Sequence, residues 1–316
     1  MGGFSSEYRI SINSGNMVYE NLDRNKYEPY RVHILQNEWF VVAHDDTPYP
    51  INKNDFTVKM GTEIIKFDCV FNTIHGTPGE NGLLQAYLEL LNIPQTAANH
   101  YQSALTFNKR DLISVLKPYG IKSAKNYFLN KEDAINPDEI IKKVGLPCFV
   151  KANRAGSSFG ITKVKQKNEL YRAAQNAFQE DDEAIIESFL DGTEVSVGVI
   201  TYNREIIALP VTEIVSENEF FDYEAKYLGK SQEITPARIS EKDTKKVQEI
   251  AKLIYKKLKM KGFTRSEFIF HNGEPHFIEM NTTPGLSQAS ILPQQAAKAG
   301  ISLQDLYGSA IEASLV

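Results

Sequence analysis

Two apolar stretches in the last third of the chain, Gly262–Phe270 and Pro275–Asn281, constrain its fold more than any other feature. Both are short and rich in Phe and Ile, which is typical of β-strands. Between them, His271-Asn272-Gly273 supplies residues that tight hairpin turns favour. The sequence therefore predicts that these two strands pair as a hairpin.

The polar residues of this hairpin are expected on one face. Side chains alternate along a strand, so Arg265 and Glu267 point the same way, as do Glu279 and Asn281. Two neighbouring carboxylates repel, whereas oxygen ligands of this kind suit Mg²⁺, which binds phosphates as well. The alternative is a solvated strand face with ordinary charges. Thr282–Gly285 favours the metal, because a glycine lets a backbone N–H approach a ligand closely.

The segment Ile278–Gly285, IEMNTTPG, resembles the C-terminal signature of ATP-grasp carboxylate–amine ligases. The continuation through Ser290–Pro293 resembles D-alanine–D-alanine ligases in particular, and the similarity covers essentially the whole chain. The resemblance implies an ATP-grasp fold of α/β and α+β class. In that fold an N-terminal open parallel-sheet domain of Rossmann type accompanies two α+β domains that hold the nucleotide between them.

Composition bounds the class of protein. The 316 residues suffice for two or three domains, and 42% apolar with 24% charged residues is ordinary for a soluble protein. The net charge of −5 argues against a general nucleic-acid or anionic-membrane surface. Cys69 and Cys148 lie in apolar runs without metal-ligand spacing, which favours buried thiols. No apolar run has the length of a membrane span and no leader opens the sequence, so we expect a cytoplasmic protein.

The expected elements divide the chain into an N-terminal substrate domain, a central ATP-grasp subdomain, and a C-terminal ATP-grasp and metal domain with a lid loop. Their residues are 1–100, 101–190, 191–316 and, for the lid loop, 216–236. The apolar run Ile64–Ile74 predicts a central strand of a mainly parallel sheet in the first part. A Gly-Gly turn such as Met1-Gly2-Gly3 normally follows a buried strand. We therefore expect that the first strand is missing from this sequence and that Met1 corresponds to an internal residue.

Other segments carry clear helix or strand patterns. Helices are expected over Ser11–Arg24, Leu83–Leu91, Thr106–Leu116 and Asn168–Gln179, and strands over Arg31–Leu35, Trp39–Ala43, Pro147–Ala152, Ala184–Phe189 and Glu194–Thr201.

A loop rich in Gly and Ser, Lys151–Gly160, follows one of these strands. Backbone N–H groups in such a loop can surround phosphate oxygens, although Gly-Ser loops are more often ordinary turns. In the resemblance, Lys151 and Lys109 match two lysines that hold the ATP phosphates. Ser157 matches a serine that reaches towards the first substrate.

A second group of residues surrounds the end of the strand Ala184–Phe189. Taken singly, carboxylates such as Glu187 and Glu194 are more often exposed surface residues. The resemblance instead puts Glu187 near the adenine and Glu194 at the ribose hydroxyls. The family often has Lys-Trp where this chain has Ser188-Phe189, so a charge is absent there. The nucleotide-binding residues implied in this part of the chain and beyond it are Glu187, Phe189, Leu190, Glu194 and Phe268.

The segment Phe220–Gly229, FFDYEAKYLG, resembles the mobile ω-loop of D-alanine–D-alanine ligases. In the resemblance Phe220 and Lys226 contact the nucleotide, and Tyr227 bonds Ser157 and closes the site. Closure matters because an acyl phosphate would hydrolyse in open water. Without the resemblance, a Lys-Tyr pair in a loop is more often a surface feature.

The stretch His75–Gly82 resembles the family motif HG-x-x-GE-x-G, in which His75 lies near the carboxylate of the first substrate. A lone His at a strand end is more often structural. The family has a Glu that binds the substrate ammonium where, in this alignment, Arg9 stands. Glu7 lies two residues earlier, and we expect it to take over that role.

For the hairpin region the resemblance implies roles in metal binding, oxyanion stabilisation and binding of the second substrate. The implied metal ligands are Glu267, where the family usually has Asp, Glu279 and Asn281. The implied oxyanion groups are Arg265 and the N–H of Gly285. The implied contacts to the carboxylate of the second substrate are Ser290 and Ile291.

Together these matches predict ATP-dependent ligation of two D-alanines through an acyl phosphate, for peptidoglycan precursors. The implied ligands are ATP, D-alanine and Mg²⁺, as two ions with Mn²⁺ as a possible substitute, and the implied assembly is a homodimer. One alternative is an ATP-grasp ligase with another acceptor, such as a depsipeptide ligase, against which Lys226-Tyr227 argues. The other is a non-catalytic nucleotide-binding homologue, against which the intact metal set argues.

Overall fold

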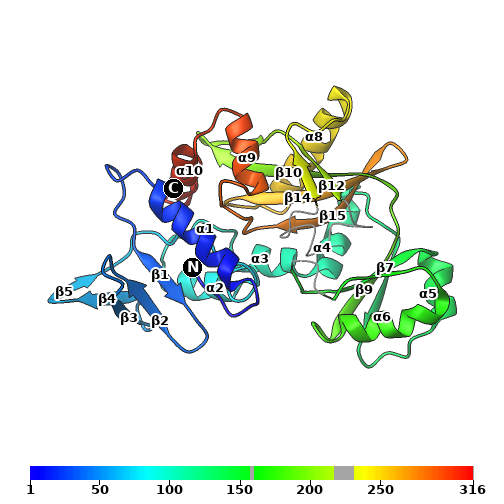
Figure 1. Ribbon diagram of the computed structural model, residues 1–316, viewed down its shortest axis with the longest axis horizontal. Helices are drawn as coiled ribbons and strands as arrows, with labels where there is room; N and C mark the ends of the chain where they lie inside the picture. The colour runs from blue at the N-terminus through cyan, green and yellow to red at the C-terminus, as the bar shows by residue number, and fades with distance from the viewer. Residues whose placement is uncertain (157–159, 217–230, 316) are drawn as a thin grey trace.

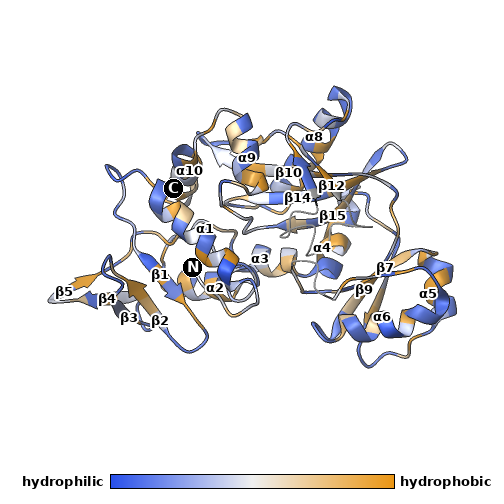
Figure 2. Ribbon diagram, in the orientation of Figure 1, coloured by the Kyte–Doolittle hydropathy of each residue, from blue (hydrophilic) through white to orange (hydrophobic). Residues whose placement is uncertain are grey.

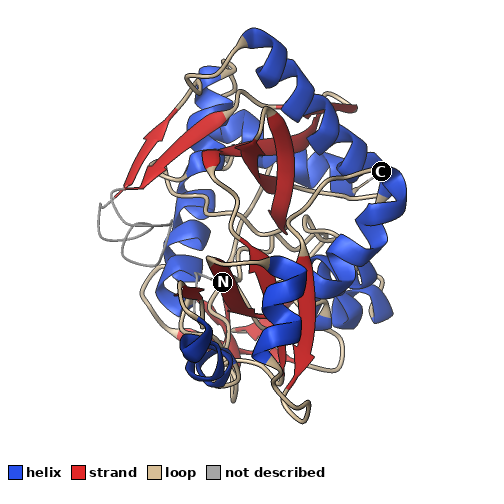
Figure 3. Cartoon of the chain, turned by 90° about the vertical axis from the view of Figure 1, so that its right-hand side faces the viewer, coloured by secondary structure: helices blue, strands red, loops and turns tan. Residues whose placement is uncertain are grey.

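A computed structural model of the chain describes residues 1–156, 160–216 and 231–315. Within that part the strands form three sheets, of five, six and four strands, and all neighbouring strands within each sheet pair antiparallel. The five-stranded sheet lies at the left in Figure 1, the four-stranded sheet at the lower right, and the six-stranded sheet above and between them. Turned by 90°, the strands form an upper and a lower group with helices around them (Figure 3).

The N-terminal sheet is a meander in which each strand pairs with the next. Its strands are β1 (Arg31–Ile34), β2 (Trp39–Val42), β3 (Pro48–Asn52), β4 (Thr57–Met60) and β5 (Glu63–Ile65). The connections have between two residues (61–62) and five (43–47), too few for the crossover that parallel strands require. The predicted open parallel sheet is therefore wrong for this region. Parallel pairing in it is limited to the isolated bridges Gly2–Ile34 and Val70–Gln95.

The predicted strand Ile64–Ile74 is also wrong beyond its first residues. After β5 the backbone is irregular, and its polar groups bond singly to other segments, as Val70 N does to Pro94 O (2.8 Å). The side chain of Asn72 accepts a hydrogen bond from Ile74 N (3.0 Å) and donates one to Gly79 O (2.8 Å). Such local bonds offer the backbone an alternative to a ladder, so an apolar composition did not suffice for a strand here.

Two helices pack with this N-terminal region. Helix α1 (Tyr8–Asn21) begins three residues earlier than expected, and α2 (Leu83–Leu90) agrees with the expected helix. Leu84 and Leu88 of α2 are buried in one cluster with residues of β1 to β4. By contrast, Val18 and Leu22, in and just after α1, belong to a cluster formed mainly by the C-terminal part of the chain, including α10 (Leu303–Ser314).

The central part of the chain builds a small sheet with its own core. Its strands follow the order β6 (Asn126–Asn130), β9 (Glu183–Ser188), β7 (Cys148–Ala152) and β8 (Thr162–Val164). Helices α5 (Pro137–Val144) and α6 (Leu170–Ala177), the latter preceded by the 3-10 turn Lys167–Glu169, cover it. Figure 2 shows orange on these strands and blue on the outer side of α5. Cys148 is fully buried in this core, as predicted, and burial raises the pKa of its thiol to about 11.

The C-terminal sheet is the largest. Its strands follow the order β13 (Ser231–Ile234), β12 (Thr212–Ser216), β10 (Gly192–Tyr202), β14 (Thr264–His271) and β15 (Glu274–Asn281), and β11 (Glu205–Ala208) pairs with β10. The apolar stripe of α8 (Glu241–Lys257) packs in one core with β10, β14 and β15. Helices α3 (His100–Phe107) and α4 (Lys109–Leu116), followed by the 3-10 turn Lys117–Tyr119, join the same core, and α9 (Ile291–Lys298) packs against β10.

The helix expected over Thr106–Leu116 is divided at Asn108, which separates α3 from α4. Asn108 has an extended backbone, and its side chain accepts a hydrogen bond from Asp111 N (3.0 Å). This is the geometry of an N-cap, so α4 begins afresh at Lys109. Because α4 begins at Lys109, this division determines the position of the Lys109 backbone from which the side chain extends.

The predicted hairpin is present, with β14 and β15 joined by Asn272-Gly273. Both turn residues have positive φ, 52° and 74°, as a two-residue hairpin turn that continues the strand twist requires. The register sets Arg265 opposite Asn281 and Glu267 opposite Glu279, and it shifts by one residue after Glu267. Within the described residues no helix is long and apolar enough to cross a membrane.

Candidate active site

Two cavities meet at the polar face of the hairpin. The first has a volume of about 360 Å³ and is lined by residues of the N-terminal and C-terminal parts of the chain. The second, of about 120 Å³, lies between the small central sheet and the hairpin. The residues that line both cavities are Lys109, Ala155, Gly156, Arg265 and Glu279. A molecule in one cavity would therefore face a molecule in the other across this shared wall.

The charged side chains of the hairpin converge as the sequence predicted. Residues directly opposite on paired strands have Cβ atoms roughly 5 Å apart, which brings Glu267 and Glu279 together on one face. Arg265 Nη1 contacts Glu267 Oε1 and also donates to Ser196 Oγ (3.3 Å). Lys109 Nζ lies 3.7 Å from Glu279 Oε2. Each carboxylate thus has a cationic neighbour from the protein.

Asn281 connects this face to the N-terminal part of the chain. With its amide oriented to satisfy both neighbours, Asn281 accepts a hydrogen bond from Arg265 Nη2 (3.1 Å) and donates one to Glu80 Oε1 (3.0 Å). The second oxygen of Glu80 accepts from Gly76 N (2.7 Å). The guanidinium of Arg265 is therefore held by strands of its own sheet and, through Asn281, by the loop after residue 75.

Glu80 is a site residue that the sequence analysis did not assign. It is buried, and burial together with the nearby Glu7 carboxylate raises its pKa to about 8. The signal that could have identified it was its place as the Glu of the motif HG-x-x-GE-x-G. That motif was used only to interpret His75.

Replacing Glu80 with glutamine is expected to remove a loss of stability at high pH. The pKa of this carboxyl in the folded protein lies above its ordinary value of 4.5. Its contribution to the free energy of unfolding is therefore fully present below about pH 4.5 and is lost as the pH rises towards 8. One pKa unit corresponds to about 1.4 kcal/mol. Between pH 5 and 8.5, the free energy of unfolding of the variant should therefore rise by at least about 1 kcal/mol relative to that of wild type, as measured by urea unfolding of metal-free protein. Parallel stability profiles for the two proteins would contradict this prediction.

Lys151 provides the second cationic side chain at the shared wall. It lies on β7, and its Nζ is 2.7 Å from Glu187 Oε2 on the neighbouring β9. Burial lowers the pKa of Lys151, but the carboxylates of Glu187, Glu279 and Glu194 together more than offset this, and the net shift is upward. The lysine is therefore charged in the folded protein. Lys109 Nζ donates to Ala155 O (2.8 Å), so both predicted phosphate lysines flank the loop that follows β7.

The predicted adenine-side residues lie around the second cavity. Glu187, Ser188, Leu190 and Glu194 line it. Phe189 does not line it and instead stacks towards Phe149, with Lys163 Nζ 4.6 Å from the centre of its ring. Lys163 thus brings a positive charge close to the position where the family often has a lysine. Phe268 is fully buried against Phe277 in the C-terminal core and lines neither cavity, so the structure does not bring it to the predicted nucleotide site.

The predicted first-substrate residues line the far end of the first cavity. Glu7 is buried, and its Oε2 is close enough to Gly156 that a Cβ there would lie 3.0 Å away. Arg9, by contrast, is exposed on α1. Glu7, not Arg9, therefore has the position from which a substrate ammonium could be bound.

His75 is buried beside Glu7 and is held by α1. Its backbone N donates to Ser11 Oγ (2.9 Å), and its Nε2 lies 3.4 Å from Ser14 Oγ. Burial, with the charge of Arg265, lowers the pKa of His75 to about 4. The imidazole is therefore neutral near pH 7 and can serve as a hydrogen-bonding group. It does not supply a cation.

The residues predicted for the second substrate also line the first cavity. Gly285, Ser290 and Ile291 all contribute to its wall. A Cβ on Gly285 would lie 2.7 Å from Ser290 Oγ, so any larger residue there would displace this hydroxyl. Ser290 Oγ is 2.8 Å from Ser287 Oγ, and Ser290 precedes the first turn of α9. The predicted loop and lid residues Ser157, Phe220, Lys226 and Tyr227 lie outside the described residues.

The donor set at the hairpin fits Mg²⁺. Glu267, Glu279 and Asn281 offer hard oxygen atoms, and the two facing carboxylates favour a cation between them. Among the residues that the structure describes, no group of three or more His, Cys, Asp or Glu side chains could hold a metal alone. Mg²⁺ usually takes few protein ligands and completes its shell with waters and phosphate oxygens.

Similarity to solved structures defines the class of protein. The chain superposes on the VanG D-Ala:D-Ser ligase from Enterococcus faecalis with a TM-score of 0.86 and 32% identity, covering 100% of this chain and 98% of that one. For the D-alanine–D-alanine ligase from Coxiella burnetii the TM-score is 0.88, with 27% identity and coverage of 99% and 92%. For the ATP complex of the Bacillus anthracis D-alanine–D-alanine ligase the TM-score is 0.79, with 30% identity and coverage of 100% and 95%. The fold and the site define an ATP-dependent ligase with the ATP-grasp fold, as the motifs predicted.

Sequence comparison identifies the family within that class. Family models for the N-terminus and the C-terminus of D-ala D-ala ligase match residues 1–98 and 115–312. The D-alanine–D-alanine ligase of Christiangramia forsetii is 79% identical over 100% of this chain and 97% of that protein. That of Flavobacterium johnsoniae is 65% identical, with coverage of 100% and 98%. The chain belongs to the D-alanine–D-alanine ligase family.

Proposed function

We propose that this chain converts two D-alanines and ATP into D-alanyl-D-alanine, ADP and phosphate, and so supplies the dipeptide for peptidoglycan precursors. The observation that supports this most directly is the shared wall of the two cavities. A carboxylate in the first cavity would face a γ-phosphate in the second, with Lys109 and Arg265 between them. That is the juxtaposition that carboxylate activation by ATP requires.

In the first step the carboxylate of one D-alanine attacks the γ-phosphorus, and the bond from this phosphorus to the ADP oxygen breaks. Positioning and charge neutralisation dominate such a transfer. Lys109 and Lys151 supply positive charge from either side of the loop after β7, and we assign Lys226 and Phe220 to the nucleotide as well. The acyl phosphate that forms is sensitive to water, and we assign Tyr227 with Ser157 to closing the site over it.

In the second step the amine of the other D-alanine attacks the acyl phosphate carbon. The tetrahedral oxyanion is stabilised by the guanidinium of Arg265 and the backbone N–H of Gly285. Phosphate then leaves, and the amine loses its proton as the peptide bond forms. Ser290 and Ile291 hold the carboxylate of this second D-alanine through the serine hydroxyl and the backbone.

Glu267, Glu279 and Asn281 would hold Mg²⁺, as two ions in our proposal, with Mn²⁺ as a substitute. Bound by these residues, the metal would supply positive charge that neutralises the phosphates. The protein itself contributes Arg265 and Lys109, which already contact the two carboxylates.

The first D-alanine is bound in our proposal by Glu7 at its ammonium and by neutral His75 near its carboxylate. The burial of Glu7 supports this role, because a buried carboxylate gains most from a cationic partner. The nucleotide is bound by Glu187 and Leu190 at the base and by Glu194 at the ribose, all of which line the second cavity.

Replacing Glu7 with alanine is expected to raise the KM for D-alanine by one to two orders of magnitude (roughly 10- to 100-fold), because an ammonium loses its charged partner. ATP affinity should change little. Steady-state kinetics with each substrate varied in turn would measure both effects. The matched control is Arg9→Ala, since Arg9 is exposed two residues away and should leave both constants near wild type. Unchanged D-alanine kinetics in Glu7→Ala would contradict the assignment.

Release of phosphate from ATP tests the function itself. We expect D-alanine to stimulate phosphate release strongly, and D-alanyl-D-alanine to accumulate in equal amount. D-lactate or D-serine supplied with limiting D-alanine tests the acceptor, because a depsipeptide or mixed-dipeptide ligase would consume them. ATP binding without any D-alanine-dependent phosphate release would instead identify a non-catalytic homologue.

The surroundings of the enzyme follow from the same proposal. D-alanine and ATP are substrates found in the cytoplasm, and we propose that the chain works there as a homodimer. Analytical ultracentrifugation at micromolar concentration would test the assembly.

A further inference from the structure

We propose that Asn153 is a positioning residue for phosphoryl transfer, which sets the separation of Lys109 and Lys151 by joining the start of α4 to the end of β7. The inference rests on the proposed function, in which these two lysines hold the ATP phosphates. It concerns a residue that does not line either cavity and touches neither substrate.

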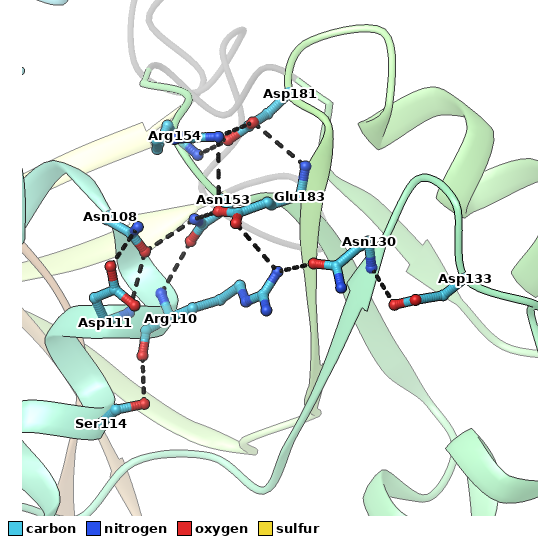
Figure 4. Close-up of polar contacts among 10 residues, drawn as sticks. All are labelled: Asn108, Arg110, Asp111, Ser114, Asn130, Asp133, Asn153, Arg154, Asp181 and Glu183. Atoms are coloured by element: carbon cyan, nitrogen blue, oxygen red, sulfur yellow. Dashed lines mark hydrogen bonds and ion pairs between the residues drawn. The ribbon is translucent and has the colours of Figure 1, made fainter.

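Every N–H group of Asn153 donates a hydrogen bond and each of its oxygens accepts one, and Figure 4 shows the residue at the centre of a polar network. It is fully buried. Its Oδ1 accepts from Arg110 N (2.9 Å), and its Nδ2 donates to Asn108 Oδ1 (2.9 Å) and to Glu183 Oε2 (2.7 Å). Its backbone N donates to Glu183 O (2.9 Å), and its carbonyl accepts from Lys109 N (3.4 Å).

These bonds hold the residues on either side of Lys109 in the sequence. Asn108 caps α4 and Arg110 follows Lys109, and Asn153 binds the side chain of the first and the backbone N of the second. The main chain of Lys109 is thereby fixed against the end of β7. Its ammonium then reaches Ala155 O, two residues beyond Asn153.

Lys151 is fixed by the same residue through the strand. Lys151 lies on β7 and Asn153 is the first residue after this strand, so that only Ala152 separates them. The bonds of Asn153 to Glu183 continue the pairing of β7 with β9, on which the Lys151 partner Glu187 lies. Asn153 is therefore a single buried group through which the positions of both lysines are coupled.

The outer members of the network support Asn153 but do not reach the lysines. Arg154 pairs with Asp181 (2.7 Å), and Arg110 Nη1 donates to Asn130 Oδ1 (2.8 Å). Both contacts are visible at the edges of the group in Figure 4. Asn130 therefore offers a matched control, because it is an asparagine of the same network whose removal leaves the bonds around Lys109 intact.

Replacing Asn153 with alanine is expected to lower kcat about 100-fold, since displacements of about 1 Å have effects of that size. It should also weaken ATP binding, measured by titration calorimetry, at least about tenfold, while the KM for D-alanine stays within about threefold of wild type. Asn130→Ala should bind ATP with the affinity of wild type, although its melting temperature should fall by an amount comparable to that of Asn153→Ala. If Asn153→Ala binds ATP like wild type, or if both variants lose ATP affinity equally, Asn153 has only a structural role and the proposal is overturned.

A second pair of variants decides the question even if Asn153→Ala does not fold. Asn153→Asp sets a carboxylate against Glu183 and should lose ATP affinity. Adding Glu183→Gln lets the new amide donate to the carboxylate at position 153. This replaces the bond to Glu183 but not the one to Asn108, and it should recover part of that loss, about tenfold. Absence of recovery would overturn the proposal. The proposed function fails separately, if wild type itself shows no ATP binding or no D-alanine-dependent phosphate release.

Discussion

Replacing Arg265 with alanine is expected to lower the rate of dipeptide formation at least about 100-fold, because it removes one charged oxyanion donor. ATP affinity should remain nearly that of wild type, because the phosphates keep Lys109 and Lys151. Arg265 contacts Glu267 and Asn281, so the variant also loses the group that holds these two side chains. Single-turnover measurement of phosphate release gives the rate, and titration calorimetry gives the ATP affinity. Together they separate the loss of rate from any loss of ATP binding.

The matched control for this prediction is Arg238→Ala. Arg238 makes a bidentate pair with Glu213 at the other side of the same sheet and lines neither cavity. Its loss should lower stability without lowering the single-turnover rate. Comparable rates for Arg265→Ala and wild type would refute the role assigned to Arg265.

Replacing Lys151 with methionine is expected to abolish measurable ATP binding and to destabilise the protein. The ammonium faces the carboxylate of Glu187, whose side chain is only 5% exposed. Breaking a buried ion pair by removing one partner typically costs about 3–5 kcal/mol, because the remaining charge stays buried. Urea unfolding gives the loss of stability, and calorimetry with ATP gives the loss of binding.

The two losses are separable with a second substitution. In Lys151→Met/Glu187→Gln the buried charge is gone, so stability should recover by at least about 2 kcal/mol. ATP binding should not recover, because the phosphate still lacks its lysine. If the double variant binds ATP and forms dipeptide at the wild-type rate, Lys151 does not hold a phosphate. If stability fails to recover, the destabilisation has a source other than the ion pair.

The hairpin could be predicted from the sequence because its determinants are local. Asn272-Gly273 fixes the turn and the strand pairing beside it. The one-residue shift after Glu267, which sets Glu267 opposite Glu279, is not given by the turn. The site residues that belong to sequence motifs, such as His75 and Lys151, were located in the same way, with the family resemblance supplying their roles.

The parts that could not be predicted depend on contacts between distant segments. The irregular backbone after Ile65 is set by bonds to Pro94 and Gly79, which no local pattern reveals. Glu80 becomes a site residue only because Asn281, some two hundred positions later, lies against it. Asn153 resembles any polar residue at a strand end until its three side-chain bonds are known.

The distribution of the hydrophobic clusters along the chain has a consequence for how substrates enter the active site. The first and last parts of the chain share one hydrophobic cluster, and Gly262 meets Thr96 O so closely that a Cβ would lie 2.0 Å from it. The central sheet has a cluster of its own, and of its buried residues Ile185 alone joins the cluster of the C-terminal part. We therefore expect the enzyme to open by a rotation of the central sheet relative to the first and last parts of the chain, which move together as one rigid body. The cavity for the amino acids is formed mainly by the first and last parts of the chain, whereas Ala155 and Gly156 of its wall and the nucleotide contacts of the central sheet have to be brought into place at each cycle.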